Sequence, residues 1–163
     1  MNNFKVIPAI AEVLLHSGNM RLLDRVIDFD SEFAVTEYTP LGNAWYADDN
    51  GNMPVWVGLE LMAQTISAHA GLLKYDSGKA LKHGALLGTR SYSVTTPFFE
   101  ANQPLYIQVA MVYRDESGLG AYDCAISNTN TAFKNGGNNV LATATLKVFE
   151  PDNFQDVLQD DLS

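Results

Sequence analysis

The stretch Val55–Leu73, with the sequence VWVGLELMAQTISAHAGLL, decides the fold. It is the longest apolar run in the chain, it contains no proline, and Lys74 follows it as a favourable residue for a helix C-terminus. The run approaches the length of a membrane span, but Glu60 would be costly in the middle of a bilayer. We therefore predict a helix over about 55–74 that is buried in protein, and no membrane span.

The segments on either side of this helix alternate between apolar and polar residues as β-strands do. Two strands are expected before the helix, at 20–29 and 32–39, joined by a two-residue turn at Asp30–Ser31. A short amphipathic helix is expected at 7–15 and a loop rich in Pro, Gly, Asn and Asp at 40–54. Four longer strands are expected after the helix, at 84–95, 104–114, 119–129 and 139–149.

A helix as apolar as 55–74 needs cover on nearly every side. A curved antiparallel sheet wrapped around one long central helix supplies that cover. The pattern therefore indicates an α+β chain with the hot-dog architecture. We expect a single domain over 1–150 and an acidic tail over 151–163, which carries several aspartates and no basic residue.

Composition excludes several classes of function. The chain has 163 residues, 47% of them apolar, which suffices for one full core. A net charge of −9 argues against nucleic acid as a partner. The N-terminus lacks the pattern of a signal peptide, so a cytoplasmic protein is expected. Cys124 is the single cysteine and is expected to be a small buried residue, and no spacing predicts a metal or a cofactor.

One face of the central helix carries polar and small residues. At about 100° per residue, Glu60, Gln64, Ser67 and Gly71 form a stripe, whereas His69 points away from it. A carboxylate on such an apolar helix has two explanations that the pattern does not separate. Glu60 is either a general acid or base in an apolar channel, or a structural residue satisfied by Gln64 and backbone groups.

The helix and its flanks resemble a known family. The segment Met53–Gln64, with Met-Pro, an acidic residue and then Met-Ala-Gln, is similar to the central-helix motif of the β-hydroxyacyl-acyl-carrier-protein (ACP) dehydratases. The segments Leu14–Val26 and Gly84–Arg90 look like that family's N-terminal stretch and its strand after the helix. The resemblance covers about 12–110 and is greatest to the dehydratase-like proteins of aryl polyene synthesis.

The resemblance implies a hot-dog homodimer or heterodimer that dehydrates a 3-hydroxyacyl-ACP thioester without a cofactor. The acidic catalytic residue maps onto Glu60. A backbone amide at the helix N-terminus would polarise the thioester carbonyl. The substrate-binding residues would come from the same stretch of the chain: Pro54, Val55, Trp56, Gly58 and Gln64.

The chain departs from the family pattern at two positions. The catalytic histidine that precedes Met-Pro in the family is replaced here by Tyr46, and the glycine that follows Met-Pro is Val55. Tyr46 is a candidate catalytic residue, with Asp48, Asp49 or a partner subunit's histidine as alternatives; it is otherwise a residue packed in the loop without a catalytic role. His16, which follows the first helix, is expected to be a cap or surface residue, with a position near a dimer-interface channel as the alternative.

Basic residues cluster after the helix, although the whole chain is acidic. Lys74, Lys79, Lys82 and Arg90 fall within 17 residues that contain one acidic residue, so they are a candidate docking surface for an acidic acyl carrier protein. Three functions therefore stay open. The chain is a 3-hydroxyacyl-ACP dehydratase, a non-catalytic subunit of an active dehydratase, or an acyl thioesterase.

Overall fold

The computed structural model of the chain describes residues 6–75, 77, 81, 84–130 and 139–150. The described elements are two α-helices, one 3-10 helix and eight strands. In chain order they are α1 (Ile10–Val13), η1 (Gly18–Met20), β1 (Arg25–Phe29), β2 (Phe33–Tyr38), β3 (Met53–Pro54), α2 (Val57–Tyr75), β4 (Ala85–Val94), β5 (Phe98–Phe99), β6 (Leu105–Arg114), β7 (Leu119–Ser127) and β8 (Val140–Phe149).

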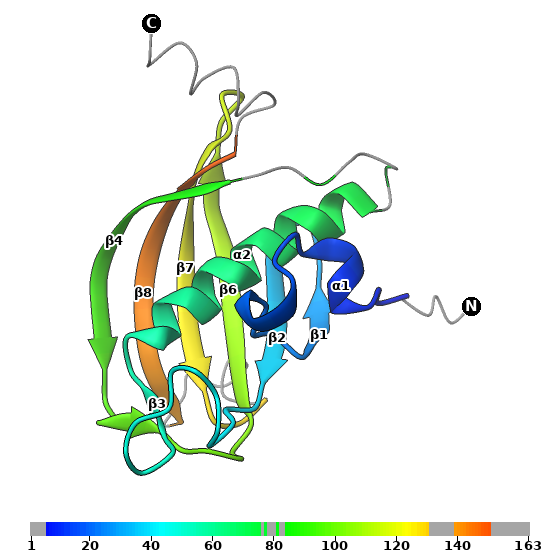
Figure 1. The fold of residues 1–163 in the computed structure, drawn as a ribbon. Coiled ribbons are helices and arrows are strands. Elements are labelled where there is room, and N and C mark those ends of the chain that lie inside the picture. The colour runs from blue at the N-terminus through cyan, green and yellow to red at the C-terminus, as the bar shows by residue number, and fades with distance from the viewer. Residues whose placement is uncertain (1–5, 76, 78–80, 82–83, 131–138, 151–163) are drawn as a thin grey trace, which may run out of the picture.

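Six strands form one antiparallel sheet in the order β1-β2-β6-β7-β8-β4. The sheet curves around α2, which lies along its concave side, and β4 forms one edge while β1 forms the other (Figure 1). The remaining strands, β3 and β5, pair as a short separate ladder in which Met53 faces Phe99. The predicted architecture, a curved antiparallel sheet around one long helix, is confirmed.

The face of α2 that meets the sheet carries the core. Leu61 and Met62 are completely buried, and side chains of this size contribute roughly 1.5–3 kcal/mol each on burial. Thr65 donates a hydrogen bond to the carbonyl of Leu61 (2.7 Å) and lies 2.8 Å from the hydroxyl of Thr36 on β2. This buried hydroxyl pair fixes the position of α2 along the sheet.

The N-terminal segment packs closely against α2 at Gly71. A Cβ built on Gly71 would lie 2.1 Å from the carbonyl oxygen of Val13, so only glycine permits this approach. The chain leaves α1 in an extended conformation at Leu14 (φ −126°, ψ 125°), whose side chain is buried in the core. The helix is therefore shorter than the predicted 7–15, and His16 follows it beside α2.

Smaller differences from the sequence predictions have local causes. The first strand begins at Arg25 because the preceding residues form η1, where Gly18 has a φ of +57°. The β1–β2 turn lies one residue later than predicted, since the amide of Asp30 bonds to the carbonyl of Phe33. The two-residue ladder of β3 and β5 was not predicted. No helix in the described part of the chain is long and apolar enough to cross a membrane.

Candidate functional site

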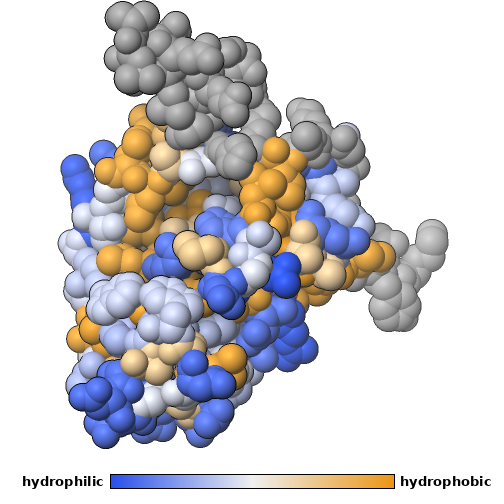
Figure 2. Space-filling model, in the orientation of Figure 1, coloured by the Kyte–Doolittle hydropathy of each residue, from blue (hydrophilic) through white to orange (hydrophobic). Residues whose placement is uncertain are grey.

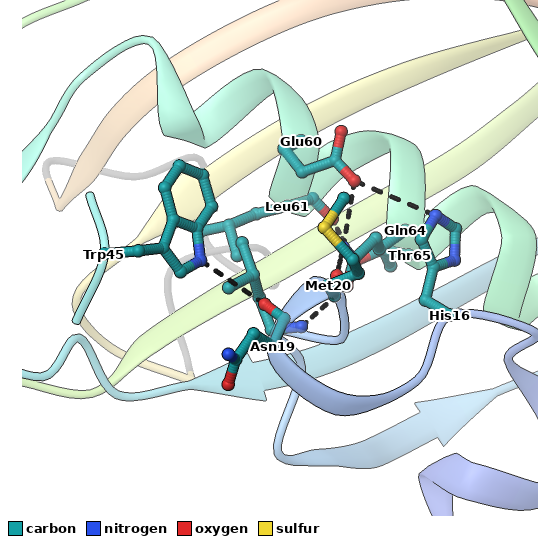
Figure 3. Close-up of polar contacts among 9 residues, drawn as sticks. His16, Asn19, Met20, Trp45, Glu60, Leu61, Gln64 and Thr65 are labelled. Carbon is teal, nitrogen blue, oxygen red and sulfur yellow. Dashed lines mark hydrogen bonds and ion pairs between the residues drawn. The ribbon is translucent and has the colours of Figure 1, made fainter.

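Glu60 lies near the N-terminal end of α2 and faces His16 of the N-terminal segment. The His16 Nε2 atom is 3.8 Å from the Glu60 Oε1 atom (Figure 3). Both side chains are partly accessible, 33% for His16 and 42% for Glu60. The chain thus brings together a carboxylate and an imidazole, the two side-chain types used most often for proton transfer.

Gln64 binds both Glu60 and the N-terminal segment that carries His16. Its Nε2 donates hydrogen bonds to the carbonyl of Met20 (2.6 Å) and to Glu60 Oε1 (2.9 Å), while its Oε1 accepts the amide of Leu22 (3.0 Å). Gln64 is completely buried, and these contacts occupy both its amide protons and its carbonyl oxygen. The side chain therefore joins the N-terminal segment to α2 and restricts the carboxylate of Glu60 (Figure 3).

His16 and Glu60 open onto a cavity of about 180 Å³ between α2 and the sheet. Ala63, Ser67 and Ala70 form its wall on α2, and Leu86 of β4 lies on the side of the sheet. A second cavity, of about 250 Å³, shares His16, Ser67 and Ala70 with the first. Figure 2 shows a hollowed region with hydrophobic atoms at its edge on this face of the molecule. Small side chains on the helix thus leave room for an apolar chain beside Glu60 and His16.

The N-terminus of α2 is covered by Tyr92 of β4. The Tyr92 hydroxyl donates to the carbonyl of Val55 (2.5 Å), and burial raises the pKa of Tyr92 to about 12. A Cβ on Gly58 would lie 2.3 Å from that hydroxyl, so the absence of a side chain at position 58 lets Tyr92 approach. The amide of Gly58 bonds to the carbonyl of Val55 at 3.0 Å.

Comparison with known proteins decides the family. A family model described as ApeP-like, ApeP dehydratase, matches residues 8–159. The chain belongs to the ApeP-like dehydratase family. Its fold is the hot-dog fold expected from the sequence. No curated protein gives a significant sequence match.

Solved structures agree with this family and fold. The ApeP-like chain is similar to a chain of the dehydratase heterocomplex ApeI:P from Xenorhabdus doucetiae, with 26% identity over 93% of this chain and 96% of that chain and a TM-score of 0.82. AziG from S. sahachiroi shares the fold at 14% identity, covering 79% and 90% of the two chains (TM-score 0.56). Thioesterase superfamily member 2 from Mus musculus does so at 9% identity, covering 77% and 79% (TM-score 0.54).

Four of the five predicted substrate-binding residues of this ApeP-like chain lie at the N-terminus of α2, Gln64 lies two turns further along the helix, and none of the five lines the cavity of Glu60. Pro54 lies in β3, and Trp56 is 57% exposed beside Trp45, with 6.2 Å between ring centroids. Gly58 lies under Tyr92, and Gln64 holds the N-terminal segment. In the described part of the chain, Glu60 is the one predicted site residue on the wall of that cavity.

Tyr46, the residue at the position of the family's histidine, is 5% exposed. Its hydroxyl lies in a short contact with that of Tyr38 and accepts the amide of Leu41 at 2.9 Å. Asp48, the nearest predicted alternative, accepts the amides of Asn50 and Asn52 at 2.9 Å each. Both side chains are therefore engaged in holding the loop between β2 and β3.

The predicted carrier-docking residues are only partly described. Lys74, with 12% of its side chain exposed, forms an ion pair with Glu150, which also lies 3.6 Å from Arg114. Arg90 is exposed on β4. Lys79 and Lys82 lie outside the described residues.

The histidines show what sequence reasoning found and missed. His69 points away from Glu60, as predicted, and is completely buried between the Tyr122 hydroxyl (3.1 Å) and the carbonyl of Asp30 (2.9 Å). Burial lowers the pKa of His69. His16, expected to be a cap or surface residue or else to lie near a channel, is one-third exposed and lies beside Glu60 at the edge of the cavity. Its place in a segment resembling the family's N-terminal stretch was the available signal. Among the described residues, no group of three His, Cys, Asp or Glu could hold a metal ion.

Proposed function

We propose that this chain dehydrates a 3-hydroxyacyl-ACP thioester to the trans-2-enoyl thioester in fatty-acid-like or aryl polyene synthesis. One observation carries the proposal: in a chain of a dehydratase family, the carboxylate of Glu60 opens onto a cavity between the central helix and the sheet. A carrier-linked substrate of this kind would place the reaction in the cytoplasm.

In this reaction Glu60, as a carboxylic acid, protonates the departing C3 hydroxyl, and a second group removes the C2 proton. The hydrogen bond from Gln64 Nε2 (2.9 Å) fixes Oε1 of Glu60, and no hydrogen bond from the described residues reaches the other oxygen, which we assign to the substrate. The N-terminus of α2, with Pro54, Val55, Trp56 and Gly58 around it, is the proposed binding site for the thioester carbonyl. The apolar walls of the cavity suit an acyl chain.

We propose that the chain works in a dimer with a related hot-dog subunit or with a second copy of itself. β4 ends the sheet, and it exposes Leu86 (44%) and Leu87 (56%) along that edge. An unpaired edge strand with exposed leucines favours pairing with another chain. The similar chain of X. doucetiae belongs to a heterocomplex.

The carrier protein is proposed to dock on basic residues near the cavity. Arg90 is exposed on β4, and Lys79 and Lys82 precede that strand in the sequence. Lys74 contributes less to this proposal because it is paired with Glu150. The double variant Lys79→Glu/Lys82→Glu tests this surface, and its affinity for the acyl carrier protein should be lower than that of the wild type. Unchanged affinity would remove this docking surface from the proposal.

Mass analysis of the product tests the function. The protein, alone and with any hot-dog subunit that copurifies with it, is incubated with 3-hydroxyacyl-ACP, and the enoyl product is followed. Glu60→Gln should lose at least about 100-fold in kcat, the lower range for one acid–base group, whereas Glu100→Gln at an exposed position should match the wild type. Free acid as the product would make the protein a thioesterase.

A non-catalytic subunit is the second candidate, favoured by the engagement of the Tyr46 hydroxyl with Tyr38 and the amide of Leu41. Under that hypothesis the complex is active, but Glu60→Gln in this chain leaves the rate unchanged. The same assay therefore separates the two functions.

A further inference from the structure

We propose that Arg114 and Glu150 form a second binding site in the cavity of Glu60, which takes a hydroxyl group at the far end of the acyl chain; the direction of the chain rests on the proposed function. Both residues border the same cavity of about 180 Å³ as Glu60. Neither residue was singled out by the sequence, and neither takes part in the dehydration step.

The charged pair and Glu60 lie at different ends of this cavity. Glu60 and Ala70, which both line it, are ten residues apart on α2, a distance of about 15 Å along the helix axis. Glu150 lies beside the last turn of α2, because it forms an ion pair with Lys74. An acyl chain whose C3 hydroxyl lies at Glu60 and which follows α2 toward its C-terminus therefore ends beside Glu150 and Arg114.

Arg114 is held at the cavity by a row of buried hydrogen bonds. His69 Nε2 lies 2.9 Å from the carbonyl oxygen of Asp30, so this nitrogen carries the ring proton and Nδ1 accepts the proton of the Tyr122 hydroxyl (3.1 Å). Burial lowers the pKa of His69, which favours this neutral form. Burial raises the pKa of Tyr122, while the charge of Arg114 and its hydrogen bond to the Tyr122 hydroxyl lower it. Since Tyr122 is 1% exposed, this contact fixes the guanidinium from the side of the core.

Arg114 and Glu150 present a hydrogen-bond donor and an acceptor side by side. Arg114 Nη2 is 3.6 Å from Glu150 Oε1, which is longer than a hydrogen bond, and the two side chains are 29% and 11% exposed. A hydroxyl group both donates and accepts, so it can accept from Arg114 and donate to Glu150 at the same time. A carboxylate at the chain end would be repelled by Glu150, so the neutral hydroxyl fits this pair better.

An apolar chain end is disfavoured at this position. It would displace water from two charged groups without replacing their hydrogen bonds. Gly120, which pairs with Arg114 across the sheet, and Gly118, whose carbonyl accepts the amide of Glu150 at 2.9 Å, also border the cavity. Because these glycines carry no side chains, the wall leaves room for a chain end at the charged pair.

Pairs of 3-hydroxyacyl-ACP substrates that end in a hydroxyl or in a methyl group test the site over a series of chain lengths. The full chain is assayed together with any hot-dog subunit that copurifies with it. At the length that reaches the site, the hydroxyl-ended substrate should have a kcat/KM higher by about 10- to 100-fold, the effect of one hydrogen bond to a charged group. Chains too short to reach the site should show no preference.

Arg114→Met keeps a long unbranched side chain, removes the donor and leaves Glu150 paired with Lys74. In this variant the preference for the hydroxyl end should disappear, whereas kcat/KM for the methyl-ended substrate should be retained. Arg25→Met is the matched control, because Arg25 lies on β1 at the other edge of the sheet with 65% of its side chain exposed. This control should keep the preference of the wild type.

Binding of the same pairs as unreactive acyl-pantetheine amides, measured by isothermal titration calorimetry, separates this inference from the proposed function. If the wild type dehydrates both kinds of substrate equally at every length, or if folded Arg114→Met keeps the preference, the site is refuted and the dehydratase function stands. If no assembly forms enoyl product but the amides bind with a preference that depends on Arg114, the proposed function fails and the site stands. Equal binding of both amides without enoyl product refutes both.

Discussion

Replacing Gly71 with alanine tests the contact that brings His16 to the central helix. By helix propensity alone, glycine to alanine inside a helix stabilises a protein by about 1 kcal/mol. The structure predicts the opposite sign. An added Cβ would lie 2.1 Å from the carbonyl oxygen and 2.9 Å from the carbonyl carbon of Val13, and 3.1 Å from Leu81 Cδ2.

The magnitude follows from the nature of these neighbours. Two of the three atoms belong to the backbone, so no rotation of a side chain relieves the overlap, and the N-terminal segment must shift by about 1 Å to restore an ordinary contact. Overpacking costs about 1–3 kcal/mol, and an overlap with backbone atoms belongs at the upper end of that range, about 3 kcal/mol. After the gain in helix propensity, a net loss of roughly 2 kcal/mol remains, which lowers Tm by about 4–8 °C for a domain of this size.

Thermal unfolding by circular dichroism measures the change, with Gly42→Ala as the matched control. A Cβ on Gly42 would meet its nearest neighbour at 3.7 Å, so that variant should keep its Tm within about 1–2 °C, typical of a change outside packed contacts. A Tm equal to or above that of the wild type would refute the packing of this segment on α2.

Three further predictions concern buried polar groups. Gln64→Met retains the side-chain volume but leaves the amide of Leu22 without its acceptor, so the free energy of unfolding in urea should fall by roughly 2–4 kcal/mol. The control Gln108→Met, half-buried in β6, should change that free energy by less than about 1 kcal/mol. Equal unfolding midpoints for the two variants would contradict the hydrogen bonds of Gln64. Burial lowers the pKa of His69 below its unfolded value of 6.5, so the unfolded state binds the proton first and the free energy of unfolding should decrease as pH falls below about 6.5. His69→Gln should weaken that dependence, measured by urea denaturation at pH 7 and pH 5. Burial raises the pKa of the Cys124 thiol to about 12, so iodoacetamide should label it slowly in the folded protein at pH 8 and rapidly in urea, and fast labelling of the folded protein would contradict its burial.

The fold was largely predictable because its main signals are local. The run Val55–Leu73 becomes α2 at Val57–Tyr75, and the four later strands lie within two residues of their predicted ends. Apolar periodicity fixes such elements independently of the rest of the chain. The ladder of β3 and β5 was missed because two residues hold no period, and its pairing of Met53 with Phe99 depends on the tertiary structure.

The stripe on α2 was predicted as a set, but its members do different things. Helical geometry correctly placed Glu60, Gln64, Ser67 and Gly71 on one face. It could not reveal that Gln64 and Gly71 receive the N-terminal segment, because those contacts join residues more than 40 positions apart. For the same reason His16 could not be matched to Glu60 from the sequence. The sequence singled out Glu60, but nothing in the sequence showed that His16 would lie beside it.

The loop between β2 and β3 holds the Tyr46 side chain in a structural position. The Tyr46 hydroxyl is bound to Tyr38 and to the amide of Leu41, which ties the loop back to β2. At the other end of the loop, Asn52 Oδ1 accepts the amide of Ala101 at 3.2 Å. A side chain at position 46 therefore points into the core and contributes to the stability of the loop. Among the described residues, His16 is the histidine that lies within 4 Å of the Glu60 carboxylate, in the segment that Gln64 and Gly71 hold against α2.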